Sequence, residues 1–116
     1  MELNPEKYFM ALSDMTRLRS LILLAQEGEL CVCEITYALA AIQPKISRHL
    51  AILRETGIIT DYRKGQWVYY RLNENLPAWA QKALSAAVEG SSKFEPFVTD
   101  RTNLAQMPDR PDSRCA

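Results

Sequence analysis

Several features that mark other classes of protein are scarce or missing in this chain of 116 residues. It carries no formal net charge, one histidine and three cysteines. No apolar run approaches the roughly 20 residues that a membrane-spanning helix needs. The N-terminal MELNPEKYF also lacks the charged-then-apolar pattern of a secretion signal. We therefore expect a cytoplasmic protein with one small domain, whose 47% of hydrophobic residues suffices for a core.

The odd number of cysteines argues against a framework of structural disulfides, which a reducing compartment also disfavours. Two of the thiols, Cys31 and Cys33, stand one residue apart in ELCVCEI, residues 29–35. The third, Cys115, lies near the C-terminus. This arrangement favours metal binding or thiol chemistry. The alternative is that Cys31 and Cys33 are small buried hydrophobic residues.

The zero net charge conceals an uneven distribution. Residues 1–42 have three basic and six acidic side chains, residues 43–71 have six and two, and residues 72–116 have five and six. The net charges of these segments are therefore −3, +4 and −1. A basic patch in the middle of the chain indicates contact with nucleic acid more directly than the total charge does.

Hydrophobic spacing predicts helices over residues 5–13, 15–28, 29–40, 43–56 and 75–90. Residues 58–72 alternate instead, which predicts a β-hairpin with Gly65 in its turn. Two short helices joined by a tight turn and followed by a hairpin form a winged helix-turn-helix, a mainly α fold. We assign residues 1–90 to this DNA-binding and dimerisation domain, and residues 91–116 to a flexible C-terminal tail.

The helix over residues 43–56 has two dissimilar faces. Ile46, Leu50 and Leu53 cluster on one side, and polar side chains point away from it. The candidates for reading DNA in the major groove are Gln43, Lys45, Ser47, Arg48 and His49. The ring of His49, at the edge of the apolar face, either contacts phosphate or packs. The alternative is that all these polar side chains simply form the solvent-exposed face of a surface helix.

The predicted hairpin carries Arg63 and Lys64 at its tip, where basic side chains suit the minor groove or its phosphates. We expect Trp67 and Tyr70 mainly to pack the wing on the body. The helix over residues 75–90 has an apolar face wider than a monomer of this size needs. With residues 5–13, it is the predicted interface of a homodimer that would match an inverted-repeat operator in double-stranded DNA.

Two thiolates select soft ions. A closed zinc site needs four ligands, and this chain has too few cysteines and histidines for one. Trivalent arsenic or antimony needs only three ligands. Cys115, an oxygen or an exogenous thiol would then complete the pair Cys31 and Cys33. Residues two apart face away from each other in a regular helix, so we expect the thiols to meet only where the turn is irregular.

In order along the chain, ELCVCEI, QPKISRHLAILRETGI and RKGQWVYYRL resemble the ArsR/SmtB family of metalloregulatory repressors, and in particular its arsenic-responsive ArsR members. The resemblance implies a dimeric winged-helix repressor that arsenite or antimonite releases from its operator, so that resistance genes are expressed. It also implies that Cys31 and Cys33 are ligands and that Gln43, Lys45, Ser47, Arg48 and His49 lie in or beside the DNA-reading segment.

The sequence departs from the family pattern at Thr36, where many relatives have a third cysteine. The His-containing site on the last helix of other members is also absent, since residues 75–90 contain no histidine. Three alternatives differ in kind: a redox switch at the same thiols, a thiol-dependent enzyme, and a winged helix that binds only protein. The enzyme lacks support, because the thiols do not have Cys-x-x-Cys spacing.

Overall fold

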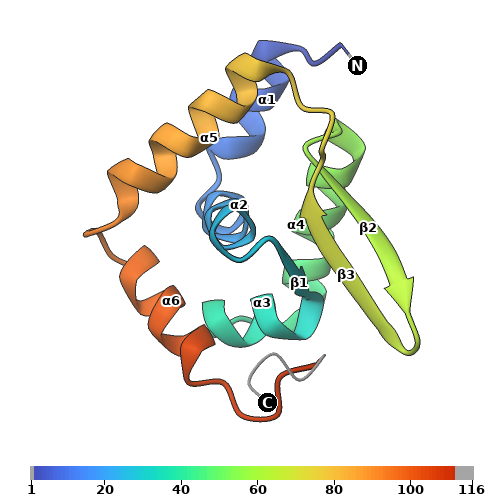
Figure 1. Cartoon of the computed structure of the whole chain (residues 1–116), viewed down its shortest axis with the longest axis vertical. Helices are drawn as coiled ribbons and strands as arrows, with labels where there is room; N and C mark the ends of the chain where they lie inside the picture. The colour runs from blue at the N-terminus through green and yellow to red at the C-terminus, as the bar shows by residue number, and fades with distance from the viewer. Residues whose placement is uncertain (1, 112–116) are drawn as a thin grey trace.

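The computed structural model describes residues 2–111, which fold around one central helix (Figure 1). The elements in chain order are α1 (Pro5–Leu12), α2 (Met15–Glu27), β1 (Glu29–Cys31), α3 (Val32–Leu39), α4 (Gln43–Thr56), β2 (Ile59–Lys64), β3 (Trp67–Leu72), α5 (Ala78–Ser91) and α6 (Phe97–Ala105). The other helices surround α2. Within the described residues, no helix is long and apolar enough to cross a membrane.

The helix boundaries follow from local chemistry. The Asn4 side chain accepts hydrogen bonds from the first turn of α1, and the Asp14 side chain does the same for α2. Gly57 ends α4 with a left-handed backbone, φ 90°, which glycine adopts without steric cost.

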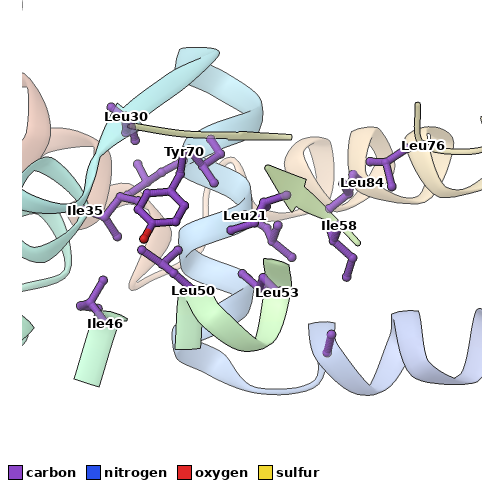
Figure 2. Packing of buried hydrophobic residues seen from close by; sticks show 14 of the residues in the cluster. Leu21, Leu30, Ile35, Ile46, Leu50, Leu53, Ile58, Tyr70, Leu76 and Leu84 are labelled. Atoms are coloured by element: carbon purple, nitrogen blue, oxygen red, sulfur yellow. The ribbon is translucent and has the colours of Figure 1, made fainter. Parts of the chain in front are cut away.

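The predicted apolar face of α4 is confirmed as part of the core. Ile46, Leu50 and Leu53 are fully buried. Figure 2 shows Leu50 and Leu53 directed toward Leu21 of α2 and Tyr70 of β3. The opposite face of α4 is thereby turned to solvent.

The winged helix-turn-helix is also confirmed, with α3 and α4 as the two helices and the β2–β3 hairpin as the wing. The expected helix over residues 29–40 is wrong at its start. Residues 29–31 form the strand β1, which joins the antiparallel sheet in the order β1-β3-β2 and pairs Cys31 with Tyr69. Tertiary pairing with β3 overrides the local helical pattern there.

The expected flexible tail over residues 91–116 is wrong for the part that the structure describes. α6 packs against α3 and α2, with the Leu104 side chain in the core. Its Asp100 accepts two hydrogen bonds from Arg19 of α2, over 2.7 and 2.9 Å. The ion pair that holds α6 joins residues far apart in the chain, so it leaves no helical spacing of apolar residues in the local sequence. For this reason the sequence did not predict the helix. Cys115 lies outside the described residues.

Candidate nucleic-acid interface and thiol site

The exposed face of α4 carries most of the predicted DNA-reading side chains. Gln43, Lys45 and Arg48 are exposed, and Ser47 is partly buried. All belong to the first two turns of the helix, which starts just after the turn at Ala40 and Ala41. Four of the five predicted residues of this helix are therefore fully or partly accessible in its first two turns.

The wing presents the other basic residues. Arg63 and Lys64 are exposed at the end of β2, beside Gly65, whose positive φ of 63° suits the tight turn. Figure 1 shows the hairpin extending away from the helices. Tyr70 packs in the core as predicted, whereas Trp67 packs only in part and remains 37% exposed. A tryptophan near the wing tip adds an apolar surface beside the basic side chains.

His49 faces α2 instead of the exposed polar surface. Its side chain is 13% exposed, and its Nδ1 accepts a hydrogen bond from Arg17 over 3.1 Å. Asp14, the capping residue of α2, lies 3.7 Å from the same nitrogen. Of the two roles considered for this ring, the geometry favours packing, because the contact with Arg17 fixes α4 against α2.

This contact predicts a pH-dependent contribution to stability. Burial lowers the pKa of His49 below its ordinary value of 6.5. The positive charges of Arg17, Arg48 and Lys45 lower it further, whereas the negative charge of Asp14 raises it. Above pH 6.5 the ring is neutral in both the folded and the unfolded chain. As the pH falls below 6.5 the unfolded chain takes up the proton first, so stability is lost until the folded ring protonates too.

We therefore expect acidification from pH 7.5 to 5.5 to lower the melting temperature less in His49→Asn than in the native protein. The difference should be at most a few degrees, because a single side chain contributes only a small part of the stability of a domain. The asparagine oxygen can still accept from Arg17 but does not titrate. Equal losses in the two proteins, measured by thermal circular dichroism, would show that this ring does not contribute.

The two thiols lie at the junction of β1 and α3. Cys31 is the N-cap of α3, with an extended backbone (φ −73°, ψ 153°), and Cys33 is in the first turn. Their Sγ atoms are 2.8 Å apart, and Cys31 Sγ also accepts from the Cys33 N–H over 3.4 Å. Because Cys31 lies just outside the helix, the helical angle that would separate the thiols does not apply. The expected irregularity is thus part of the fold.

The environment of the pair is apolar and negative. Cys31 is fully buried and Cys33 is partly buried. Burial raises the pKa of Cys33 to about 12, with Cys31 and Glu34 contributing in the same direction. Both features favour the neutral thiol of Cys33 over its thiolate.

The neighbouring oxygen atoms have other partners. Glu34 is fully buried, with Oε1 accepting from the Cys31 N–H and Oε2 from Arg110. Thr36 donates its hydroxyl to the Val32 carbonyl. No group of three metal-binding side chains is found among residues 2–111. Within that range, the site therefore offers two sulfur atoms.

Three residues of these surfaces were not predicted. Glu34 and Arg110 could not be linked from sequence, because 75 residues separate them. Ile42 carries a signal that could have been used. It stands at the N-cap of α4, where a polar residue is usual, and it is 69% exposed with no side-chain cap.

The predicted dimer surface shows exposed aromatic rings. Phe9 is 52% exposed, whereas the neighbouring Tyr8 is buried. Tyr8 donates its hydroxyl to the Ala80 carbonyl and stacks edge-on against Trp79, with centroids 5.1 Å apart. Phe9 and Trp79 thus form an apolar patch where α1 meets α5.

Comparison with known proteins agrees with this geometry. Residues 14–61 match the family described as "Bacterial regulatory protein, arsR family". The arsenic resistance transcriptional regulator ArsR1 of Pseudomonas putida is 51% identical over 98% of this chain and 88% of its own length.

Two solved structures are similar as well. The antimony-specific transcriptional repressor AntR is 27% identical, with a TM-score of 0.62, over 73% of this chain and 74% of that one. The homodimeric winged helix-turn-helix domain Mb0332 of Mycobacterium bovis is 31% identical, with a TM-score of 0.61, over 75% and 79%. The chain belongs to the ArsR family of DNA-binding transcriptional regulators.

Proposed function

We propose that this protein represses arsenic-resistance genes and leaves its operator when trivalent arsenic or antimony binds Cys31 and Cys33. The observation that carries the proposal is the 2.8 Å approach of the two Sγ atoms at the start of the helix that supports α4. The relationship to arsenic-resistance regulators supports the same class of inducer. A repressor acts where the DNA is, so we also propose a cytoplasmic location, in which thiols stay reduced.

The thiols suit a neutral trivalent hydroxide. When As(OH)₃ reacts with two thiols, two As–S bonds form, two As–O bonds break, and each thiol proton leaves with a hydroxyl group as water. No free proton is released, so the raised pKa of Cys33 does not prevent the reaction. A third position remains for Cys115, an oxygen or an exogenous thiol.

The thiol pair is adjacent to both DNA-binding elements. α3 packs against α4, and Cys31 pairs with Tyr69 of β3 in the wing. Bonding both sulfur atoms to one arsenic atom fixes their separation, which shifts the start of α3 and the end of β1. We propose that this shift changes the position of α4 relative to the wing and so weakens operator binding.

We propose that Gln43, Lys45, Ser47 and Arg48 enter the major groove and that Arg63 and Lys64 contact the minor groove or its phosphates. His49 acts indirectly, by holding α4 through Arg17. A homodimer formed through the patch of Phe9 and Trp79 would present two such surfaces to an inverted-repeat operator. A stable monomer at micromolar concentration in sedimentation would contradict the dimer.

Ile42 should add sequence preference to this surface. Its exposed side chain at the start of α4 suits apolar contact with the C5-methyl group of thymine. In an operator selected from random duplexes, we expect replacement of one thymine by uracil to weaken native binding about fourfold, since a buried methyl group is worth roughly 0.8 kcal/mol.

Ile42→Ala should bind the thymine and uracil duplexes equally, because the methyl group then has no partner. The measurement is operator affinity by fluorescence anisotropy, with each thymine of the operator replaced by uracil in turn. A native protein indifferent to every thymine-to-uracil change would remove this role from Ile42.

A redox switch is the second candidate, and the short distance between the sulfur atoms favours it too. Oxidation would join Cys31 to Cys33 and remove two protons and two electrons. The test is fluorescence anisotropy of the operator complex of reduced protein, titrated separately with arsenite and with peroxide. We expect release by arsenite at stoichiometric concentration. Release by peroxide alone would establish the redox switch instead.

A further inference from the structure

The segment after α5 contacts both ends of the helix that follows the thiols. α6 lies beside α3, and the chain after α6 runs back along α3 toward β1 (Figure 1). At the C-terminal end of α3, Asn103 donates to the Ala38 carbonyl over 3.0 Å. Arg19, held by Asp100 of α6, donates to the Leu39 carbonyl over 3.2 Å. These bonds fix α6 against the last turn of α3.

Arg110 makes the contact at the other end of α3. Its Nε donates to Glu34 Oε2 over 2.8 Å, and its Nη2 lies 2.7 Å from the same oxygen in an ion pair. The side chain of Glu34 is fully buried and that of Arg110 is 8% exposed. Because a buried carboxylate is costly without a cationic partner, Arg110 stabilises the Glu34 side chain in this buried position. Glu27, 3.5 Å from Arg110, helps to hold the guanidinium there.

Glu34 passes this constraint on to Cys31. Its other oxygen, Oε1, accepts from the Cys31 N–H over 2.8 Å and completes a capping box. This bond holds Cys31 at the N-cap with an extended backbone. If Cys31 joined the helix, its side chain would point about 200° away from that of Cys33 around the axis. The approach of the two sulfur atoms therefore depends on Glu34 and, through it, on Arg110.

We propose that Arg110 is a positioning residue for the metalloid site, through which the C-terminal segment holds Cys31 and Cys33 in the geometry that binds one arsenic atom. The inference rests on the function proposed above. It assigns residues 92–111 a role in ligand binding, which Arg110 exerts through Glu34. A metalloid that needs two sulfur atoms should therefore lose affinity when Arg110 is replaced, even with both cysteines intact.

Phenylarsine oxide is the probe, because it takes two thiols and no third ligand. The reaction forms two As–S bonds, and the oxygen leaves with both thiol protons as one molecule of water. Calorimetric titration of the full chain under reducing conditions should show about tenfold weaker binding by Arg110→Gln, which corresponds to about 1.4 kcal/mol. Arg110→Lys keeps the positive charge but loses the paired approach of two guanidinium nitrogens to Glu34. Its affinity should fall between those of the native protein and Arg110→Gln.

Arg101→Gln is the matched control, since Arg101 lies on α6 and donates to the Ser92 carbonyl, away from α3. It should bind the probe like the native protein. All titrations are made well below the melting temperature of each variant, so that lower stability alone leaves the affinity unchanged.

Native affinity in Arg110→Gln, with or without a lower melting temperature, would overturn the role of Arg110 and leave the thiol site intact. A native chain that does not bind the probe would overturn the thiol site itself. So would a Cys31→Ser/Cys33→Ser variant that binds the probe as tightly as the native chain. Failure of this inference is thereby distinguished from failure of the proposed function.

Discussion

The variant Cys31→Ser/Cys33→Ser should bind the operator normally and keep hold of it at arsenite concentrations that release the native protein. Native operator affinity should fall by about 5- to 150-fold on arsenite binding, the usual range of coupling between two sites. The double variant should show no change. Operator affinity measured by anisotropy with and without arsenite gives the comparison.

The serine substitutions preserve what the cysteines contribute to the fold. Serine is a favoured N-cap, so at position 31 its hydroxyl can take over the bond from the backbone N–H of residue 33. Cys115→Ser serves as the companion variant. If it also loses release, Cys115 is the third ligand; if it keeps release, an oxygen or an exogenous thiol takes that place. Normal release of the double variant by arsenite would contradict the proposed sensor.

Arg48→Ala should produce the opposite phenotype, with weak operator binding and unchanged affinity for the metalloid. The side chain is exposed on the face of α4 turned away from Ile46 and Leu50. Loss of an arginine that contacts a guanine should cost about 1–3 kcal/mol and relax the preference at one base pair. Loss of a phosphate contact should instead weaken all sequences equally and reduce the salt dependence.

Arg54→Ala is the matched control for this prediction. Arg54 lies at the C-terminal end of the same helix, where it pairs with Asp61 over 2.9 Å. We expect its removal to change operator affinity by less than about fivefold, because exposed ion pairs contribute roughly 1 kcal/mol or less. Equal losses in the two variants would show that Arg48 acts only through the general positive charge of the surface.

Much of the fold follows from local patterns. The buried face of α4, its end at Gly57 and the hairpin around Gly65 were all predicted, because spacing and turn residues determine them within a few positions. The strand β1 was missed because its three residues gain their partner, β3, about 40 positions further along the chain.

The sequence singled out Cys31 and Cys33 but did not predict the geometry in which they meet. In a continuous helix Cys31 and Cys33 would point away from each other. Because α3 begins at Val32, just after Cys31, the two sulfur atoms meet. That start depends on a capping bond from Glu34 and an ion pair from Arg110. The ion pair joins two segments that no local period connects, so only the folded structure shows it.

The measurement that tests the central claim most directly is X-ray absorption at the arsenic edge on the reduced protein loaded with one equivalent of arsenite. The predicted result is two or three sulfur neighbours per arsenic atom in the native protein and two fewer in Cys31→Ser/Cys33→Ser. Arsenic surrounded only by oxygen, or the same number of sulfur neighbours in both proteins, would contradict binding at this pair.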